Sequence, residues 1–180
     1  AGIGHSGTFL ATTLDEWRRV LDVNLWGVIH GCREFGTRMV ERGEGGHIVN
    51  VASAAAWLPA KDLAAYSTSK AAVAMLSDCL RPDVAAYGIG VSTICPGLID
   101  TNITRTSTFS GLDDAGPDAR RAHAAAVYGR RNFPPEGVAR EIVDAVRHAR
   151  SVVAVTPEAT AVRLLSRLSP GLLRALAAGG

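Results

Sequence analysis

Tyr66 and Lys70, in the segment Tyr-Ser-Thr-Ser-Lys, are two side chains that could exchange a proton. On a helix, a spacing of four positions places both on one face, about 6 Å apart. An isolated phenol titrates near pH ~10 and is a poor base at neutral pH, but a neighbouring ammonium favours the phenolate and lowers its pKa. The pair therefore indicates proton-transfer chemistry, although the same spacing also occurs by chance on many helices.

Ser53 and Asn24 are two further polar residues at unusual positions. Ser53 ends the apolar segment HIVNVAS, whose end would open onto the crevice at the carboxyl edge of a parallel sheet. Asn24 lies in the middle of a helical pattern, where asparagine favours neither the helix nor burial. Ser53 could simply cap a strand and Asn24 could bend a helix. The complete order along the chain, Asn24, Ser53, Tyr66, Lys70 and then Pro96-Gly97, is much harder to obtain by chance than any one of these features alone.

The elements that would position these residues alternate along the chain. Helices are predicted at 13–39, 66–87, 134–150 and 157–176, and strands at 47–53, 89–95 and 152–155. The strand at 47–53 is expected to be buried on both faces, residues 101–132 to contain one short helix, and the last helix to break near Pro170-Gly171. The first helix begins with the capping-box pair Thr13 and Glu16, and Pro82 predicts a kink or an early end in the second. Strands joined by long helical connections indicate an α/β fold with a parallel sheet and helices on its faces.

The composition is that of an ordinary globular domain, with 47% apolar and 20% charged residues in 180 positions. Scattered basic residues argue against nucleic acid as a partner, and no apolar run is long enough to span a membrane. No histidine pair has ligand spacing, so no metal is implied. Cys32, Cys79 and Cys95 lie in apolar runs, which predicts buried free thiols and a cytoplasmic protein.

Residues 1–157 resemble the short-chain dehydrogenase/reductase family. AGIG is similar to the end of the family's N-N-A-G turn, DVNLWG to its N-V-x-G helix motif, and IVNVAS to the strand that ends in the catalytic serine. Tyr66 and Lys70 match the Y-x-x-x-K pair, and ICPGLIDT matches the P-G-x-x-x-T segment beside the nicotinamide. The resemblance implies a Rossmann-like, doubly wound parallel sheet and an oxidoreductase that uses NAD or NADP on a carbonyl or alcohol.

The resemblance also implies a role for each site residue. Tyr66 would exchange a proton with the substrate oxygen, Ser53 would hydrogen-bond that oxygen, and Lys70 would hold the cofactor ribose. Asn24 would anchor a water that extends the proton relay from Lys70. The implied cofactor contacts are Ala1, Gly2, Asn24, Tyr66, Lys70, Pro96, Gly97, Ile99 and Thr101.

Within one domain at 1–180, residues 102–132 correspond to the family's variable substrate lid and 158–180 to a helical tail. The apolar side chains Trp57, Leu58 and Leu98 favour a hydrophobic small-molecule substrate. The family commonly forms homo-oligomers through the helices that correspond to those predicted at 13–39 and 66–87, so a homo-oligomer is implied.

The family's cofactor fingerprint, T-G-x-x-x-G-x-G, does not occur in this sequence. Residues 2–7 match G-x-G-x-x-G, but no strand precedes them and the helix begins too late to hold a pyrophosphate, so we interpret them as a turn. We therefore expect the N-terminal strands of the fold to be missing from this chain. Besides an active oxidoreductase, two alternatives stay open: a catalytically silent fragment or interaction module, and one domain of a longer fused protein.

Overall fold

The computed structural model describes residues 2–99, 101, 103–111, 116, 122, 126 and 133–178. At its centre is a three-stranded parallel sheet with the order β2-β3-β5. The strands are β2 (Gly46–Val51), β3 (Ile89–Cys95) and β5 (Val152–Ala154). Every residue of β3 except Gly90 is buried, as expected for the central strand of a parallel sheet. The strands nearly coincide with the predicted segments, and their pairing confirms the α/β prediction.

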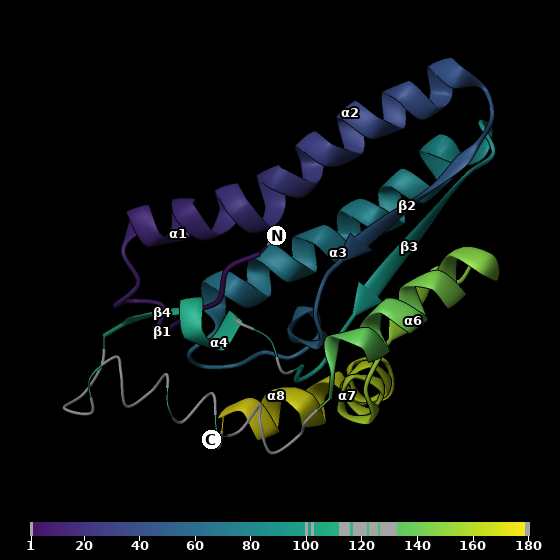
Figure 1. The fold of residues 1–180 in the computed structure, drawn as a ribbon. Coiled ribbons are helices and arrows are strands. Elements are labelled where there is room, and N and C mark those ends of the chain that lie inside the picture. Colours follow the sequence, from purple (N-terminus) through teal and green to yellow (C-terminus); the bar gives the residue numbers. More distant parts are fainter. Residues whose placement is uncertain are drawn as a thin grey trace.

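Helices cover both faces of this sheet (Figure 1). The covering helices are α2 (Gly27–Arg42), α3 (Ala64–Ala85) and α6 (Pro135–Arg147). On the face of α2 and α3, Ile48 and Val91 lie in one apolar cluster with residues of both helices. On the opposite face, Ala145 of α6 packs with Ile94 of the central strand. The sheet is therefore held rigidly between two helical layers, and its strand ends make a firm base for a site.

The first predicted helix is confirmed, but a wider turn interrupts it. α1 (Leu14–Leu21) begins with the predicted capping box, in which the Glu16 carboxylate accepts the Thr13 N–H at 2.8 Å. A π-helical turn, Asp22–Trp26, then joins α1 to α2 and contains Asn24. Such turns insert an extra residue into a helix and are frequent at functional sites.

The proline in the second predicted helix does not end it. α3 continues past Pro82 to Ala85 as one helix (Figure 1). Pro82 cannot donate to the carbonyl of Asp78, but Asp78 lies on the exposed face of α3, where water can satisfy that carbonyl. The prediction that this helix could end early at Pro82 is therefore wrong.

Two burial predictions are also wrong. Cys79 is exposed, whereas Cys32 and Cys95 are buried as predicted. Cys79 lies on the outer side of α3 together with Met75, which is 63% exposed. The strand at 47–53 was expected to be buried on both faces, yet Val51 is 43% exposed because β2 is an edge strand of the described sheet.

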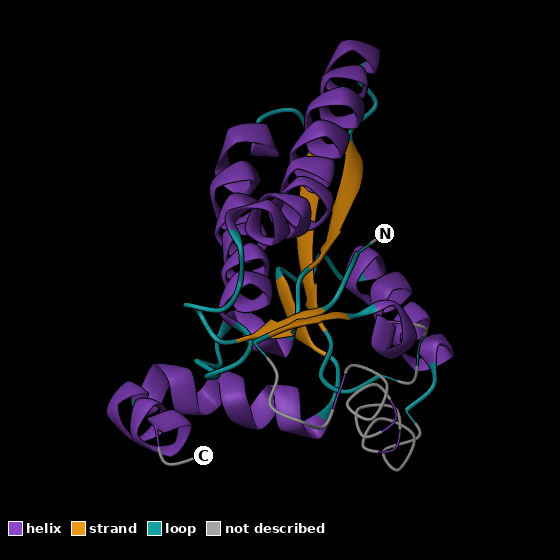
Figure 2. Ribbon diagram, turned by 90° about the vertical axis from the view of Figure 1, so that its left-hand side faces the viewer, coloured by secondary structure: helices purple, strands orange, loops and turns teal. Residues whose placement is uncertain are grey.

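Two short strands lie apart from the main sheet. β1 (His5–Gly7) pairs in parallel with β4 (Thr108–Ser110), and Figure 2 shows this pair running across the direction of the main strands. The sequence predicted only a turn for the opening residues, so this pairing was missed. One short helix was expected between 101 and 132, and α4 (Ile103–Thr106) is such a helix. Most of the lid expected at 102–132 lies outside the described residues, as does Ala1.

The C-terminal tail forms two helices in contact with each other. They are α7 (Pro157–Leu168) and α8 (Pro170–Ala178), and they meet at the predicted break near Pro170. α7 follows β5 directly, so its first turn lies at the carboxyl edge of the sheet. Among the described helices, none combines the length and the apolar character that crossing a membrane requires.

Candidate active site

Asn24 is held in the π-helical turn by hydrogen bonds to a distant part of the chain. Its side chain accepts the Ile3 N–H at 2.9 Å and donates to the Ile3 carbonyl at 3.0 Å. Nδ2 also lies 3.2 Å from the Ser69 hydroxyl, and Asn24 is only 1% exposed. An asparagine that is unfavourable in a helix is thus satisfied completely by tertiary contacts, and it fastens the opening segment to α3.

Ser53 follows the end of β2, as predicted. Its backbone is extended, and its hydroxyl accepts the Ala55 N–H at 3.2 Å to begin a short 3-10 turn at Ala54–Ala56. The next amide, Ala54 N–H, donates to the Pro96 carbonyl at 2.8 Å. The serine loop and the turn after β3 are therefore joined directly at the carboxyl edge of the sheet.

Tyr66 and Lys70 lie near the start of α3, where Lys70 Nζ is 5.9 Å from the centroid of the Tyr66 ring. Lys70 is only 6% exposed, and Nζ donates to the Val51 carbonyl at 3.1 Å. Burial lowers the pKa of Lys70, and the nearby Cys95 opposes this to a smaller extent. Burial raises the pKa of Cys95 itself to about 12, so this thiol stays neutral and cannot pair with the lysine.

Gly2 lies beside the same group. A Cβ added to Gly2 would be 3.5 Å from Asn24 Oδ1 and 3.8 Å from Lys70 Nζ. A side chain at residue 2 would therefore touch the lysine amine, so the opening segment passes close to Lys70. Among the described residues, the buried amine is flanked by main chain of β2 and by this opening segment, and it has no carboxylate partner.

The predicted nicotinamide segment continues from β3 at the same edge of the sheet. Pro96 and Gly97 follow Cys95, Ile99 is 7% exposed, and the Thr101 hydroxyl accepts the Ile103 N–H at 3.4 Å. The structure therefore brings Gly2, Asn24, Ser53, Tyr66, Lys70 and the 96–99 segment to one end of the sheet. Of the predicted set, only Ala1 lies outside the described residues.

Sequence reasoning missed Ser69, a completely buried residue on α3. Its hydroxyl donates to the Tyr66 carbonyl at 2.7 Å and lies 3.2 Å from Asn24 Nδ2. Ser69 thus links the tyrosine's own helix turn to the asparagine. The available signal was the helical spacing: Ser69 stands three residues after Tyr66, which places it on the same side of the helix as Tyr66.

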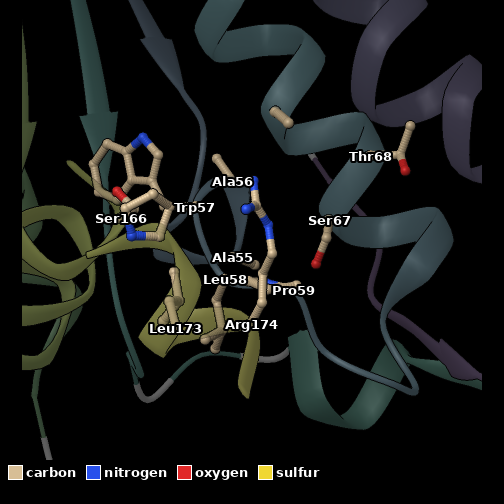
Figure 3. Close-up of a pocket in the computed structure, with 12 residues that line it drawn as sticks. Ala55, Ala56, Trp57, Leu58, Pro59, Ser67, Thr68, Ser166, Leu173 and Arg174 are labelled. Carbon is tan, nitrogen blue, oxygen red and sulfur yellow. The ribbon is translucent and has the colours of Figure 1, made fainter. Parts of the chain in front are cut away.

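The apolar residues expected to shape the substrate site are divided between two places. Trp57 and Leu58 line a cavity of about 370 Å³, together with Leu173 and Arg174 of α8. Figure 3 shows the Arg174 side chain extending across this cavity toward the 54–56 turn. The side chains that line it include neither Ser53 nor Tyr66, so the cavity lies beside the predicted catalytic residues. Leu98 belongs to the predicted nicotinamide segment instead.

Within the described residues, no group of three or more histidine, cysteine, aspartate or glutamate side chains could hold a metal ion. The polar side chains that converge at the sheet edge are an amide, hydroxyls and an amine. These groups are suited to hydrogen bonding with sugar hydroxyls and a carbonyl, and to moving protons.

Comparisons with known proteins agree with this geometry. The family profile described as "short chain dehydrogenase" matches residues 1–109. "Probable oxidoreductase EphD" of Mycobacterium tuberculosis is 50% identical over 179 residues, which cover 98% of this chain and 30% of that protein. The structure of a short-chain dehydrogenase/reductase of Burkholderia phymatum in complex with NAD is 29% identical in sequence, with a TM-score of 0.76. The match covers 91% of this chain and 62% of the Burkholderia phymatum chain.

A second solved structure, a short-chain dehydrogenase of Burkholderia cenocepacia in complex with NADP, shares the fold. It is 24% identical in sequence, with a TM-score of 0.72, and the match covers 98% of this chain and 65% of the Burkholderia cenocepacia chain. The chain thus spans less than two thirds of each of these proteins. The parallel sheet with helices on both faces is the Rossmann-like arrangement of these structures, and the chain belongs to the short-chain dehydrogenase/reductase family.

Proposed function

We propose that this chain carries the catalytic part of an NAD- or NADP-dependent oxidoreductase that interconverts a carbonyl and an alcohol. The observation that carries this proposal is the buried amine of Lys70 beside the Tyr66 ring, 5.9 Å from its centroid, with Gly2 close by. Burying a lysine amine costs free energy, so a position that retains one with no carboxylate partner in the described part of the chain favours a role in chemistry.

The proposed proton chemistry begins at Tyr66. In reduction its hydroxyl gives a proton to the substrate oxygen, and in oxidation the phenolate removes one from the alcohol. Ser53 Oγ donates a hydrogen bond to the same oxygen, which stabilises the charge that develops there. The protonated Lys70 favours the phenolate of Tyr66. Asn24 and Ser69 hold this group together from the opposite side.

The nicotinamide, when bound, supplies or accepts the hydride. The residues present fit such a group, because Lys70 Nζ gives one N–H to the Val51 carbonyl and an ammonium has two further N–H donors, which would suit ribose hydroxyls. Pro96, Gly97, Ile99 and Thr101 would line the nicotinamide side. NAD and NADP are each bound by one of the solved relatives described above, and either cofactor is proposed for this chain.

The substrate is proposed to be a small and hydrophobic carbonyl compound or alcohol. Trp57 and Leu58 support this, because they place apolar surface directly after the catalytic serine turn. The side-chain cavity beside them, about 370 Å³ in volume, is large enough for a small organic group.

A homo-oligomer and a cytoplasmic location are proposed as well. The π-helical turn and the outer sides of α2 and α3 expose large apolar residues: Trp26 is 50%, Phe35 59% and Met75 63% exposed. An apolar surface of this kind supports the expected pairing through these helices. All three cysteines are free thiols, which supports a reducing compartment.

We also propose that residues 1–180 act as part of a larger protein. The family's T-G-x-x-x-G-x-G turn is absent from the sequence, and β2 offers an open edge for further strands. The mycobacterial relative is much longer than the Burkholderia phymatum protein, since this chain spans 30% of the former and 62% of the latter. The fused-protein interpretation is therefore favoured over a silent interaction module.

The test is a fluorescence titration of the full-length protein with NADH and with NADPH. Saturable binding of one or both is expected, and a weaker signal in Lys70→Met would place the bound ribose at this lysine. Lys61→Met, at an exposed lysine, is the matched control. A correctly folded protein that binds neither cofactor would contradict the proposal and leave the silent module as the function.

A further inference from the structure

The first turn of α7 contacts the turn that follows β3. Glu158 Oε1 accepts a hydrogen bond from the Leu98 backbone N–H at 3.2 Å. A Cβ added to Gly97 would collide with the Thr156 hydroxyl and lie 2.7 Å from the same Glu158 oxygen. A side chain at residue 97 would therefore displace the Thr156 and Glu158 side chains, because the N-terminus of α7 packs directly against this position.

The same turn is held from its other sides by main-chain hydrogen bonds. The Ala54 N–H donates to the Pro96 carbonyl at 2.8 Å, and the Val155 N–H donates to the Cys95 carbonyl at 3.2 Å. Leu98 is the last residue before Ile99, and the family resemblance implies that the Ile99 backbone contacts the carboxamide of the nicotinamide. The Glu158 carboxylate is thus the contact that orients the turn immediately before that position.

A purely local explanation for Glu158 exists, because an acid in the first turn stabilises a helix through its dipole. α6 begins with the same pair of residues, Pro135 and Glu136, and Glu136 is exposed. The dipole accounts equally for both acids. It does not account for the hydrogen bond from Leu98, which joins the C-terminal helix to the cofactor-side turn.

We propose that Glu158 is a positioning residue for the nicotinamide. It holds the Pro96–Gly97–Leu98 turn so that the Ile99 backbone is presented to the carboxamide in one orientation. Through this contact the C-terminal helices, which the family profile match at residues 1–109 does not include, become part of the cofactor site. The inference rests on the proposed function, since it assigns the 96–99 segment to the nicotinamide.

Cofactor affinity provides the first test, in the full-length protein. Glu158→Ala removes a charged acceptor and should weaken NADH or NADPH binding about tenfold, with a larger rise in the cofactor KM than fall in kcat. Glu158→Gln keeps an acceptor oxygen and should recover most of that loss. Glu136→Ala, the matched first-turn acid of α6, should leave the affinity unchanged.

Amide hydrogen exchange at Leu98 provides a second test, which needs no cofactor. Exchange of this amide should become about tenfold faster in Glu158→Ala, while Glu158→Gln and Glu136→Ala stay near the wild-type rate. Unchanged exchange and affinity in a folded Glu158→Ala protein would overturn the inference, as would equal losses in Glu136→Ala. If Leu98 exchanges faster in Glu158→Ala but the wild-type protein binds no cofactor, the contact between Glu158 and Leu98 stands. The nicotinamide role of Glu158 and the proposed function are then both overturned.

Discussion

At the scale of single residues, the site is built around a buried amine that has no carboxylate partner among the described residues. Lys70 donates to the Val51 carbonyl, and burial lowers its pKa. Because the pKa of Lys70 is lower in the folded protein than in the unfolded chain, the folded protein binds fewer protons at pH values between these two pKa values. The free energy of unfolding therefore rises with pH between the two pKa values. At lower pH, Lys70 is protonated in both states, and its buried charge lowers the free energy of unfolding by a constant amount.

Lys70→Met should consequently separate stability from activity. We expect the free energy of unfolding at neutral pH to increase by on the order of 1 kcal/mol, because an apolar side chain of similar length replaces a buried charge. In this variant the free energy of unfolding should no longer rise with pH just below the pKa that lysine has in the unfolded chain. Turnover should fall about a hundredfold or more. Denaturant titrations at several pH values and steady-state rates would measure both effects.

The exposed Lys61→Met serves as the comparison for that variant. A marked loss of stability in Lys70→Met at neutral pH would mean that the amine is a structural tie to Val51 rather than a retained catalytic group.

At the scale of elements, His5 links the opening segment to the chain that follows the nicotinamide segment. Its ring nitrogens lie 2.9 Å from the Thr108 hydroxyl and 3.3 Å from the Thr12 hydroxyl, and it is 2% exposed. The Ser110 hydroxyl also donates to Glu16 at 2.6 Å. β1 and β4 are therefore joined by side chains as well as by their ladder, although each strand is very short.

This junction should weaken in mild acid. Burial lowers the pKa of His5, with Glu16 opposing to a smaller extent, so the unfolded chain takes up the proton first as the pH falls below about 6.5. The stability due to neutral His5 is fully present above that pH and is lost as the pH falls through the lowered value. His5→Gln should therefore lose less stability than the wild type between pH ~7 and ~5.

Thermal unfolding across that pH range would measure the effect, with the exposed His30→Gln as control. Parallel pH profiles for wild type and His5→Gln would contradict the assignment. The difference between the two profiles is the informative quantity, because burial lowers the pKa of His47 as well and that histidine is present in both proteins.

At the scale of the whole molecule, periodicity and spacing predicted the main sheet, its order of helices and the convergence of the candidate site residues. Those features depend on local patterns, such as the buried strands and the Tyr66–Lys70 spacing. The π-helical turn at Asn24 and the β1–β4 pair depend on contacts distant in sequence, such as Ile3 with Asn24, and no local pattern encodes them. The exposed Cys79 shows that an apolar run on a helix does not specify which face is buried.

The contact of Glu158 with the 96–98 turn was likewise beyond prediction, because a first-turn acid is explained by its own helix. Nothing in the sequence distinguishes Glu158 from Glu136, which begins α6 in the same way. Only the packing of α7 beside β5 brings Glu158 to Leu98.

The central claim is that Tyr66 transfers the proton in an oxidoreductase reaction. It is tested most directly by comparing wild type and Tyr66→Phe in the full-length protein, using a panel of aldehydes and ketones with NADH and NADPH. We predict that kcat falls at least about a hundredfold while the cofactor dissociation constant changes little, since only the phenolic hydroxyl is removed. A Tyr66→Phe protein with the wild-type rate on a substrate that the wild type reduces would contradict the account.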